Sequence, residues 1–238
     1  MPSNTFNFHT IGTINSPYKE KFAIPRQPGL VTAAKGQILL QADANNELIR
    51  GIEQFSHLWV IFVFHATQAQ GWKPLVRPPR LGGNEKMGVL ATRSTFRPNP
   101  IGMSVVKLDS VNTTHKQTIL NISGLDLLND TPILDIKPYI PYSDAVLNAQ
   151  AGFAQTQPTT KLTVSFSANA QAQLLSFDQQ YAELELLITQ VLAQDPRPAY
   201  KQNKLDDKIY GMALYNLNIQ WQLTSLTQVS VLNIEQKD

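Results

Sequence analysis

The sequence contains no cysteine, which excludes disulfide bonds and thiolate metal sites. No apolar run approaches the roughly 18 residues of a membrane-spanning helix, and the N-terminus lacks the basic and then apolar pattern of a secretory signal. Both common glycine-rich phosphate-binding fingerprints, GxGxxG and the Walker loop, are missing. We therefore expect a soluble, cytoplasmic protein that is not associated with a membrane. We also expect that it does not use a doubly wound nucleotide-binding fold.

Histidine is also scarce, and the four histidines form no metal-ligand pattern. His57 and His65 are eight positions apart on an expected strand, so about 26 Å separates them at about 3.3 Å per residue. Because they cannot ligate one ion, we predict no metal site. His57 is interpreted as a partly buried residue at a strand end, whereas a ligand role is more open for His65, which precedes a long loop.

Charge is distributed unevenly along the 238 residues. Residues 1–110 carry twelve Lys and Arg against six Asp and Glu, a balance of +6. Residues 111–238 carry eight against twelve, a balance of −4, and the sum is +2. A basic first half fits a polyanionic or phosphate-bearing partner, but a solvated basic face would give the same count.

The first part reads as short strands separated by loops rich in proline and glycine. A near-continuous apolar run over residues 57–65 predicts a strand that is buried on both faces. One short helix is expected over residues 45–55, with Asn45 or Asn46 able to cap it. The other predicted strands cover residues 6–14, 88–96, 103–111, 117–125 and 131–139. Many strands with a single helix predict an antiparallel or mixed β-barrel over residues 1–145.

The second part has a different character. Residues 143–160 are polar and rich in Ala and Gln, and we interpret them as a linker. Residues 155–238 are predicted to form a small α+β domain. Its expected elements are a strand at 161–167, helices within 168–180 and 181–194, and strands at 211–223 and 228–236. The predicted fold class is therefore mainly β or α+β, with an N-terminal barrel and a small C-terminal domain.

The segment RSTFRPNPIG, residues 93–102, places two arginines before a stiff Pro-Asn-Pro corner. On an extended strand Arg93 and Arg97 would share one face about 13 Å apart. That spacing suits the two ends of a large anionic or zwitterionic ligand, since arginine is the usual residue for bidentate anion recognition. The alternative is two surface arginines beside a structural turn.

Four further segments combine proline with a cation. PRQPG at residues 25–29 ends in a glycine that permits close backbone approach. The loop at residues 66–88 contains WKPLVRPPRLGG, and loops of this length are usually functional or disordered. The other two are DIKPY and DPRPAY. Each is compatible with a plain structural turn, but five such segments in one chain indicate a ligand.

In DIKPY, Asp135, Lys137 and Tyr139 alternate along one face of an expected strand. Such a row fits proton handling or hydrogen bonding, or simply an ion pair. DPRPAY places an aromatic side chain beside a guanidinium between prolines, which can stack on and clamp a nucleotide or serve only as a packing turn. Its polar residues are Asp195, Arg197 and Tyr200.

The motifs SPYKEKFAIPRQPGL, FSHLWVIFVFH, RPPRLGG, GVLATRSTFRPNPIGMS, DIKPY and QDPRPAY, in this order and spacing, resemble the TrmO (YaeB/TsaA-like) family. The resemblance covers nearly the whole chain. It implies an S-adenosylmethionine-dependent tRNA (adenine-N6)-methyltransferase that acts on the threonylcarbamoyl-modified adenosine 3′ of the anticodon. It also implies a β-barrel methyltransferase domain, a small C-terminal domain and a homodimer with the cofactor near the dimer contact.

The resemblance further implies roles for individual residues. The cofactor would be lined by Arg26, Gln27, Pro28, His65, Ala66, Arg93, Asn99, Pro100, Ile101, Leu125, Asp126, Leu127 and Leu128, with Arg93 or Arg26 on its carboxylate. As our own hypothesis for the mechanism, Asp135 would accept the N6 proton, oriented by Lys137 and Tyr139. Asp195, Arg197 and Tyr200 would face the nucleotide. The cations expected to meet tRNA phosphates are Lys73, Arg77, Arg80 and Lys86.

Three alternatives to this function stay open at the level of the sequence. The first is a non-catalytic RNA-binding dimer that uses a basic barrel face. The second is a small-molecule hydrolase, although no Ser/His signature of a nucleophile and its base is present. The third is a structural or regulatory dimer in which the proline turns provide only rigidity.

Overall fold

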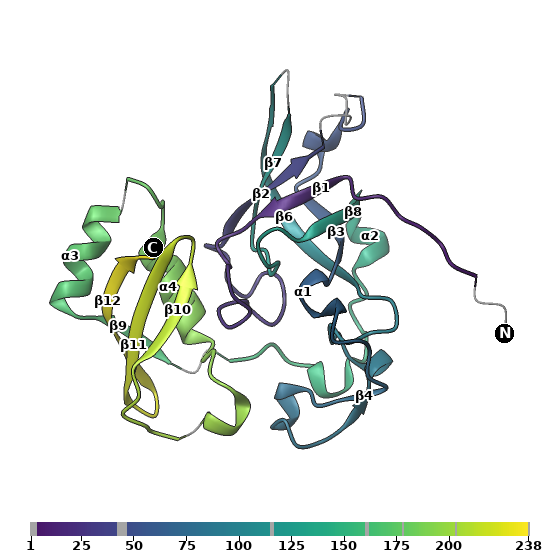
Figure 1. The fold of residues 1–238 in the computed structure, drawn as a ribbon. Coiled ribbons are helices and arrows are strands. Elements are labelled where there is room, and N and C mark those ends of the chain that lie inside the picture. The colour runs from purple at the N-terminus through teal and green to yellow at the C-terminus, as the bar shows by residue number, and fades with distance from the viewer. Residues whose placement is uncertain are drawn as a thin grey trace.

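A computed structural model describes residues 4–41, 47–114, 117–159, 162–177, 179–202 and 204–237 (Figure 1). Its first part is a closed six-stranded barrel with the strand order β1-β2-β7-β6-β3-β8. Neighbouring barrel strands are antiparallel. The bounds are β1 Gly12–Asn15, β2 Lys35–Leu40, β3 His57–Val63, β6 Ile101–Thr113, β7 Thr118–Ser123 and β8 Pro132–Pro138. The predicted barrel is therefore confirmed.

The barrel interior is filled by every second side chain of its strands. In β3, Leu58, Val60 and Phe62 are buried and face the lumen, while the residues between them are only partly buried. The prediction that both faces of this strand are buried is wrong, because its second face lies on the outside of the barrel. Gly102 of β6 faces inward, where a Cβ atom would lie 2.4 Å from the ring of Phe62.

Short elements break up the long loop between β3 and β6. They are α1 His65–Gln68, β4 Leu75–Val76, β5 Met87–Gly88, and 3₁₀ helices at Pro79–Leu81 and Val89–Ala91. The predicted strand over residues 88–96 is wrong, since β5 ends at Gly88 and a 3₁₀ turn follows. The guanidinium of Arg97 donates to the carbonyls of Thr92 at 2.8 Å and Ser94 at 3.4 Å, which curls this segment into a compact loop.

Two further local predictions need correction. The first strand begins at Gly12, so residues 6–11 are not part of it. The helix expected over residues 45–55 is reduced to a 3₁₀ helix at Ile52–Gln54, because Gly51 before it adopts a left-handed backbone with φ 86°. The proposed caps Asn45 and Asn46 lie outside the described residues.

The second part is a four-stranded sheet in the order β10-β11-β12-β9, with α3 and α4 packed on it (Figure 1). The expected single strand at 211–223 is a hairpin that turns at Tyr215, whose φ is 54°. The elements are β9 Thr163–Phe166, α3 Ala168–Phe177, α4 Leu184–Ala193, a 3₁₀ helix at Ala199–Lys201, β10 Tyr210–Leu214, β11 Leu217–Ser225 and β12 Gln228–Gln236. The segment that joins the two parts carries α2 Pro141–Asp144 and a 3₁₀ helix at Gly152–Ala154.

The loop between β1 and β2 holds the two parts together. The amide of Tyr215 donates to the carbonyl of Pro17 at 2.7 Å, and the side chain of Gln190 accepts from the amide of Ala33 at 2.9 Å. Directly after this loop, Lys35 at the start of β2 forms an ion pair with Glu183 at 2.5 Å. The barrel and the sheet also share one cluster of buried apolar side chains. Within the described residues, no helix has the length and apolarity to cross a membrane.

Candidate active site

One end of the barrel collects the first predicted cofactor segments. β3 ends at Val63, which is paired with Ile101 at the start of β6. The amide of Phe64 donates to the carbonyl of Pro100 at 2.8 Å. Residues 65–66 therefore leave the strand end directly beside the Pro-Asn-Pro corner. Sequence reasoning placed these two segments in one site, and the strand pairing brings them together.

The PRQPG loop joins the same end of the barrel. The guanidinium of Arg93 donates to the side-chain carbonyl of Gln27 at 2.6 Å. The amide of Gly29 donates to the carbonyl of Gly124 at 2.8 Å, and both glycines have positive φ angles. Lys21, which precedes PRQPG in the loop between β1 and β2, donates to the carbonyl of Ala66 at 3.1 Å. The loop thus contacts three other predicted segments.

Asp126 is a partly buried carboxyl at this end. Ser104, on an inward position of β6, donates to its Oδ1 at 2.6 Å. Burial raises the pKa of Asp126 to about 6, although the Ser104 hydroxyl and the positive charge of Arg93 act in the opposite direction. Sequence reasoning missed Ser104. The only signal was a polar residue at an inward position of an otherwise apolar strand.

The neighbours of Asp126 need a correction. Leu125 and Leu127 are fully buried, and their side chains belong to the apolar core. They cannot line a ligand with their side chains, so only their backbone is available to one. The carbonyl of Leu127 already accepts a hydrogen bond from the hydroxyl of Ser16 at 2.7 Å. Asp126 and the half-buried Leu128 are the side chains that this stretch can present.

The chemistry of this barrel end fits S-adenosylmethionine. The guanidinium of Arg93, held by Gln27, is the donor type that a free carboxylate requires. The carboxylate of Asp126 can balance the positive charge of an ammonium or sulfonium group. Arg26 is exposed in the same loop. Among the described residues, no group of His, Asp and Glu is arranged to hold a metal ion.

The DIKPY row is not part of this cluster as a unit. Lys137 and Asp135 form an ion pair at 2.9 Å on the outer face of β8, where Asp135 is paired with Ile61 of β3. Tyr139 lies toward the opposite end of β3, where its amide donates to the carbonyl of His57 at 3.0 Å. The expectation that Tyr139 orients Asp135 is wrong, because the row runs along the barrel instead of converging.

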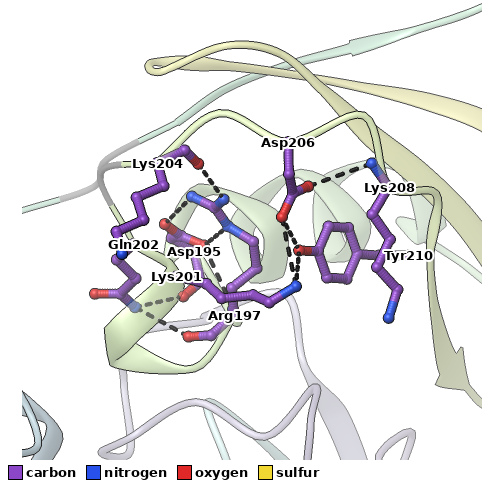
Figure 2. Close-up of polar contacts among 8 residues, drawn as sticks. All are labelled: Asp195, Arg197, Lys201, Gln202, Lys204, Asp206, Lys208 and Tyr210. Carbon is purple, nitrogen blue, oxygen red and sulfur yellow. Dashed lines mark hydrogen bonds and ion pairs between the residues drawn. The ribbon is translucent and has the colours of Figure 1, made fainter.

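The DPRPAY turn is built around a buried ion pair (Figure 2). Asp195 and Arg197 are 3% and 1% exposed, and two hydrogen bonds of 2.8 and 2.9 Å join their side chains. The hydrogen bond to Asp195 raises the pKa of Arg197. Arg197 also donates to the carbonyl of Lys204 at 2.9 Å, and Gln202 donates to the carbonyls of both pair members.

This geometry corrects the predicted role of the turn. Asp195 and Arg197 have no free surface with which to touch a nucleotide, so they shape the turn. Tyr200 differs, because its side chain is 71% exposed. The turn continues into a second polar group in which the hydroxyl of Tyr210 donates to Asp206 at 2.6 Å and accepts from Lys201 at 3.3 Å (Figure 2).

Family models match both parts of the chain. The tRNA-methyltransferase O N-terminal domain matches residues 13–145, and the TrmO C-terminal domain matches residues 159–237. The chain belongs to the TrmO family. Its barrel and its four-stranded sheet therefore correspond to two recognised units of TrmO proteins.

Individual TrmO relatives resemble the chain over almost its full length. A protein of Escherichia coli K12 named tRNA (adenine(37)-N6)-methyltransferase is 52% identical over 93% of this chain and 94% of its own. A putative S-adenosylmethionine-dependent methyltransferase of Pseudomonas aeruginosa PAO1, RcsF, is 44% identical over 97% of this chain and 98% of its own. The crystal structure of TrmO from Pseudomonas aeruginosa has a TM-score of 0.81 at 38% identity and covers 98% of this chain and 99% of that one.

Proposed function

We propose that this protein transfers a methyl group from S-adenosylmethionine to N6 of adenosine 37 in tRNA, and that the adenosine carries a threonylcarbamoyl group. The observation that carries the methyl transfer is the 52% identity, over 93% of the chain, to an E. coli protein named tRNA (adenine(37)-N6)-methyltransferase. The convergence of the predicted cofactor segments at one barrel end supports it, since a methyl donor needs such a site.

The donor would be held by the charged groups of that end. Arg93 or Arg26 would bind its carboxylate, with Gln27 fixing the Arg93 guanidinium. Asp126 would face the positive charge. When bound, S-adenosylmethionine supplies an electrophilic methyl group on a sulfonium. The contribution of the protein is alignment of the N6 nitrogen with that methyl group, and proximity of this kind can lower a barrier by several kcal/mol.

The N6 nitrogen loses its hydrogen as a proton when it is methylated. Asp135 is our candidate acceptor, and Lys137 contacts it at 2.9 Å. Both side chains lie on the outer face of β8, beside the surface that we propose below for the dimer. The site would therefore be completed by two subunits, in agreement with a donor near the dimer contact.

The tRNA would contact exposed cations of the loop between β3 and β6. Lys73, Arg77 and Lys86 are exposed there. Arg80 is exposed as well, but it donates to the carbonyl of Thr156 at 2.6 Å and so also anchors the joining segment. In the second part, Tyr200 would stack on a base, a contact of about 1–3 kcal/mol.

The homodimer would form through the outer face of β3 and β6. Three cross-strand pairs of apolar residues lie side by side on this face. Two of their members, Ile101 and Met103, are exposed in the single chain. The pairs are Trp59 with Val105, Ile61 with Met103, and Val63 with Ile101. A contiguous apolar patch on a sheet is typical of an interface. An enzyme that acts on tRNA would work in the cytoplasm.

Transfer of a labelled methyl group to tRNA from a strain that lacks the activity tests the proposal. We expect labelling of wild-type reactions only when both donor and tRNA are present. Asp135→Asn should reduce turnover about 100-fold or more, in the range of general-base effects, and leave donor affinity nearly unchanged. Absence of labelling on threonylcarbamoylated tRNA, with donor binding intact, would contradict the proposed function.

A further inference from the structure

A strongly basic lobe extends from the barrel at residues 71–97. It contains six Lys and Arg and one acid, Glu85, a balance of +5. No carboxylate of the described residues lies within ion-pair distance of these six cations. The lobe carries β4 and forms the lower right end of the molecule in Figure 1. Among these cations, Lys73, Arg77, Arg80 and Lys86 are exposed, so their positive charge is available to an anionic partner.

Trp72 is the exposed aromatic side chain of this lobe, at 57% exposure. Its backbone is fixed by the next residue, because the amide of Lys73 donates to the carbonyl of Phe96 at 3.1 Å. The ammonium group of Lys73 also lies 4.7 Å from the centre of the Phe96 ring. The indole is thus displayed on a supported segment, which limits the entropy lost when a partner binds.

The supported segment is linked to the candidate donor site. Phe96 belongs to the compact loop that the Arg97 side chain closes onto Thr92. The same loop carries Arg93, whose guanidinium is bound to Gln27. A short chain of contacts therefore runs from Lys73, the residue next to Trp72, to the barrel end that would hold the methyl donor.

We propose that Trp72 is a stacking platform for an unpaired base of the anticodon loop, with Lys73, Arg77 and Lys86 on the flanking phosphates. This inference rests on the proposed function. Sequence-specific RNA recognition targets single-stranded loops, whose splayed bases stack on aromatic side chains. Because the backbone next to Trp72 is hydrogen-bonded to the loop that carries Arg93, a base held on Trp72 would help to position the anticodon loop at this barrel end.

The charge of the lobe argues for RNA over a second copy of the chain. A two-fold symmetric contact through this surface would place one lobe of +5 against an identical lobe. Such a contact would be repulsive, whereas RNA phosphates neutralise the lobe and release counterions. The apolar patch on β3 and β6 does not share this charge, so the two surfaces would serve different partners.

The test compares Trp72→Ala with Leu90→Ala, a matched control in the same lobe whose side chain is 77% exposed. Binding of a synthetic anticodon stem-loop RNA is measured by fluorescence anisotropy over a range of salt concentrations. We expect Trp72→Ala to weaken RNA binding by about 10-fold or more, with an unchanged salt slope because no charge is removed. Trp72→Phe should restore most of the affinity, and Leu90→Ala should bind as wild type.

Three further measurements interpret the result. Calorimetry with S-adenosylmethionine and circular dichroism should give wild-type values for both alanine variants, which shows an intact fold and donor site. If the wild-type protein methylates tRNA and Trp72→Ala binds the RNA as tightly as the wild type does, the inference is overturned and the proposed function stands. The inference would also be overturned if sedimentation showed that Trp72→Ala is monomeric and the wild type dimeric, because Trp72 would then contact a second copy of the chain. Failure of the wild type to methylate tRNA would instead refute the proposed function.

Discussion

Asp126 couples the candidate site to the stability of the barrel. Burial raises its pKa to about 6, so the folded protein binds this proton more tightly than the unfolded chain does. The stabilisation from this proton is complete below the unfolded pKa and is lost as pH rises through about 6. We therefore expect the free energy of unfolding of the wild type to fall, relative to Asp126→Asn, by up to about 3 kcal/mol between acidic and mildly alkaline pH.

Urea unfolding of both proteins across this pH range measures the difference. The exposed residue Asp207 supplies the control, and Asp207→Asn should follow the wild type at every pH. If the difference in free energy of unfolding between wild type and Asp126→Asn does not change with pH, the Asp126 carboxyl is not desolvated. Ser104→Ala should move the pH of the transition upward, because the Ser104 hydroxyl favours the ionised form.

Gly102 is a second residue where local geometry decides the outcome. A Cβ atom here would lie 2.4 Å from the ring of Phe62 and 2.8 Å from the ring of Phe64, and these rings pack against each other. Gly102→Ala should lower the free energy of unfolding by about 1–3 kcal/mol, the usual cost of overpacking. Gly88→Ala is the matched control, since no atom lies within 4 Å of its added Cβ.

Thermal and urea unfolding of both glycine variants should separate them clearly. Equal stability of Gly102→Ala and wild type would mean that the phenylalanine rings move aside at little cost. Gly88→Ala is expected to remain within about 0.5 kcal/mol of the wild type.

Residue chemistry in the motifs was readable from the sequence, but the direction of each side chain was not. The guanidinium of Arg93 and the side-chain amide of Gln27 do meet at one barrel end. Leu125 and Leu127, in contrast, point into the core, and Ser104 points to Asp126. These directions depend on strand register within a closed barrel, which no local pattern specifies.

At the scale of the element, the Asp195–Arg197 pair makes the DPRPAY turn a rigid unit. Removing one partner of a buried ion pair leaves the other charge unpaired in a desolvated site. Arg197→Ala should therefore lower the free energy of unfolding by about 3–5 kcal/mol. Arg197→Lys should rescue little of this loss, because an ammonium group cannot form the two parallel hydrogen bonds to Asp195.

The surface pair Lys237–Glu20 provides the comparison for that prediction. Its atoms are 2.8 Å apart, but both side chains are about half exposed. Glu20→Gln should cost less than about 1 kcal/mol in the same unfolding experiment. Limited proteolysis adds a local readout, since Arg197→Ala should expose the segment around Tyr200 to cleavage. Similar stability losses for both variants would contradict the buried-pair argument.

Element predictions succeeded where periodicity and turn chemistry agreed. β12 matches its predicted range of 228–236, and β7 and β8 lie within theirs. The segment at 88–96 failed because a side chain, Arg97, satisfies the backbone carbonyls that a strand partner would otherwise bind. The sequence predicts one strand at 211–223 instead of the hairpin at Tyr215, because neither glycine nor proline marks the turn.

At the scale of the whole molecule, the barrel and the sheet share one core. Sequence composition indicated two units separated by a polar segment, and the family models also divide the chain there. Their contact through the loop between β1 and β2 could not be predicted, because it depends on pairings such as Gln190 with Ala33 across more than 150 residues. The same loop also contacts Ala66 and Arg93 of the candidate donor site.

The proposed dimer can be tested by placing a charge in its apolar patch. Met103 is 53% exposed at the centre of the apolar patch on β3 and β6. Met103→Glu would place an unpaired carboxylate in the interface of each subunit, near its own symmetry mate. We expect the dimer dissociation constant to rise by about 100-fold or more, which corresponds to about 3 kcal/mol. Size-exclusion chromatography with light scattering should then show a monomer.

Asn112→Glu introduces the same charge on the same strand outside the patch, where residue 112 is exposed, and it should remain dimeric. The two variants should have the same circular dichroism spectrum as the wild type, because both substitutions face outward and leave the fold of the subunit intact. If the donor site is completed by two subunits, Met103→Glu loses methyl transfer together with its dimer, and raising the protein concentration restores both. A monomeric Met103→Glu with full activity would show that each barrel end is sufficient by itself, and an unaltered dimer would place the subunit contact elsewhere.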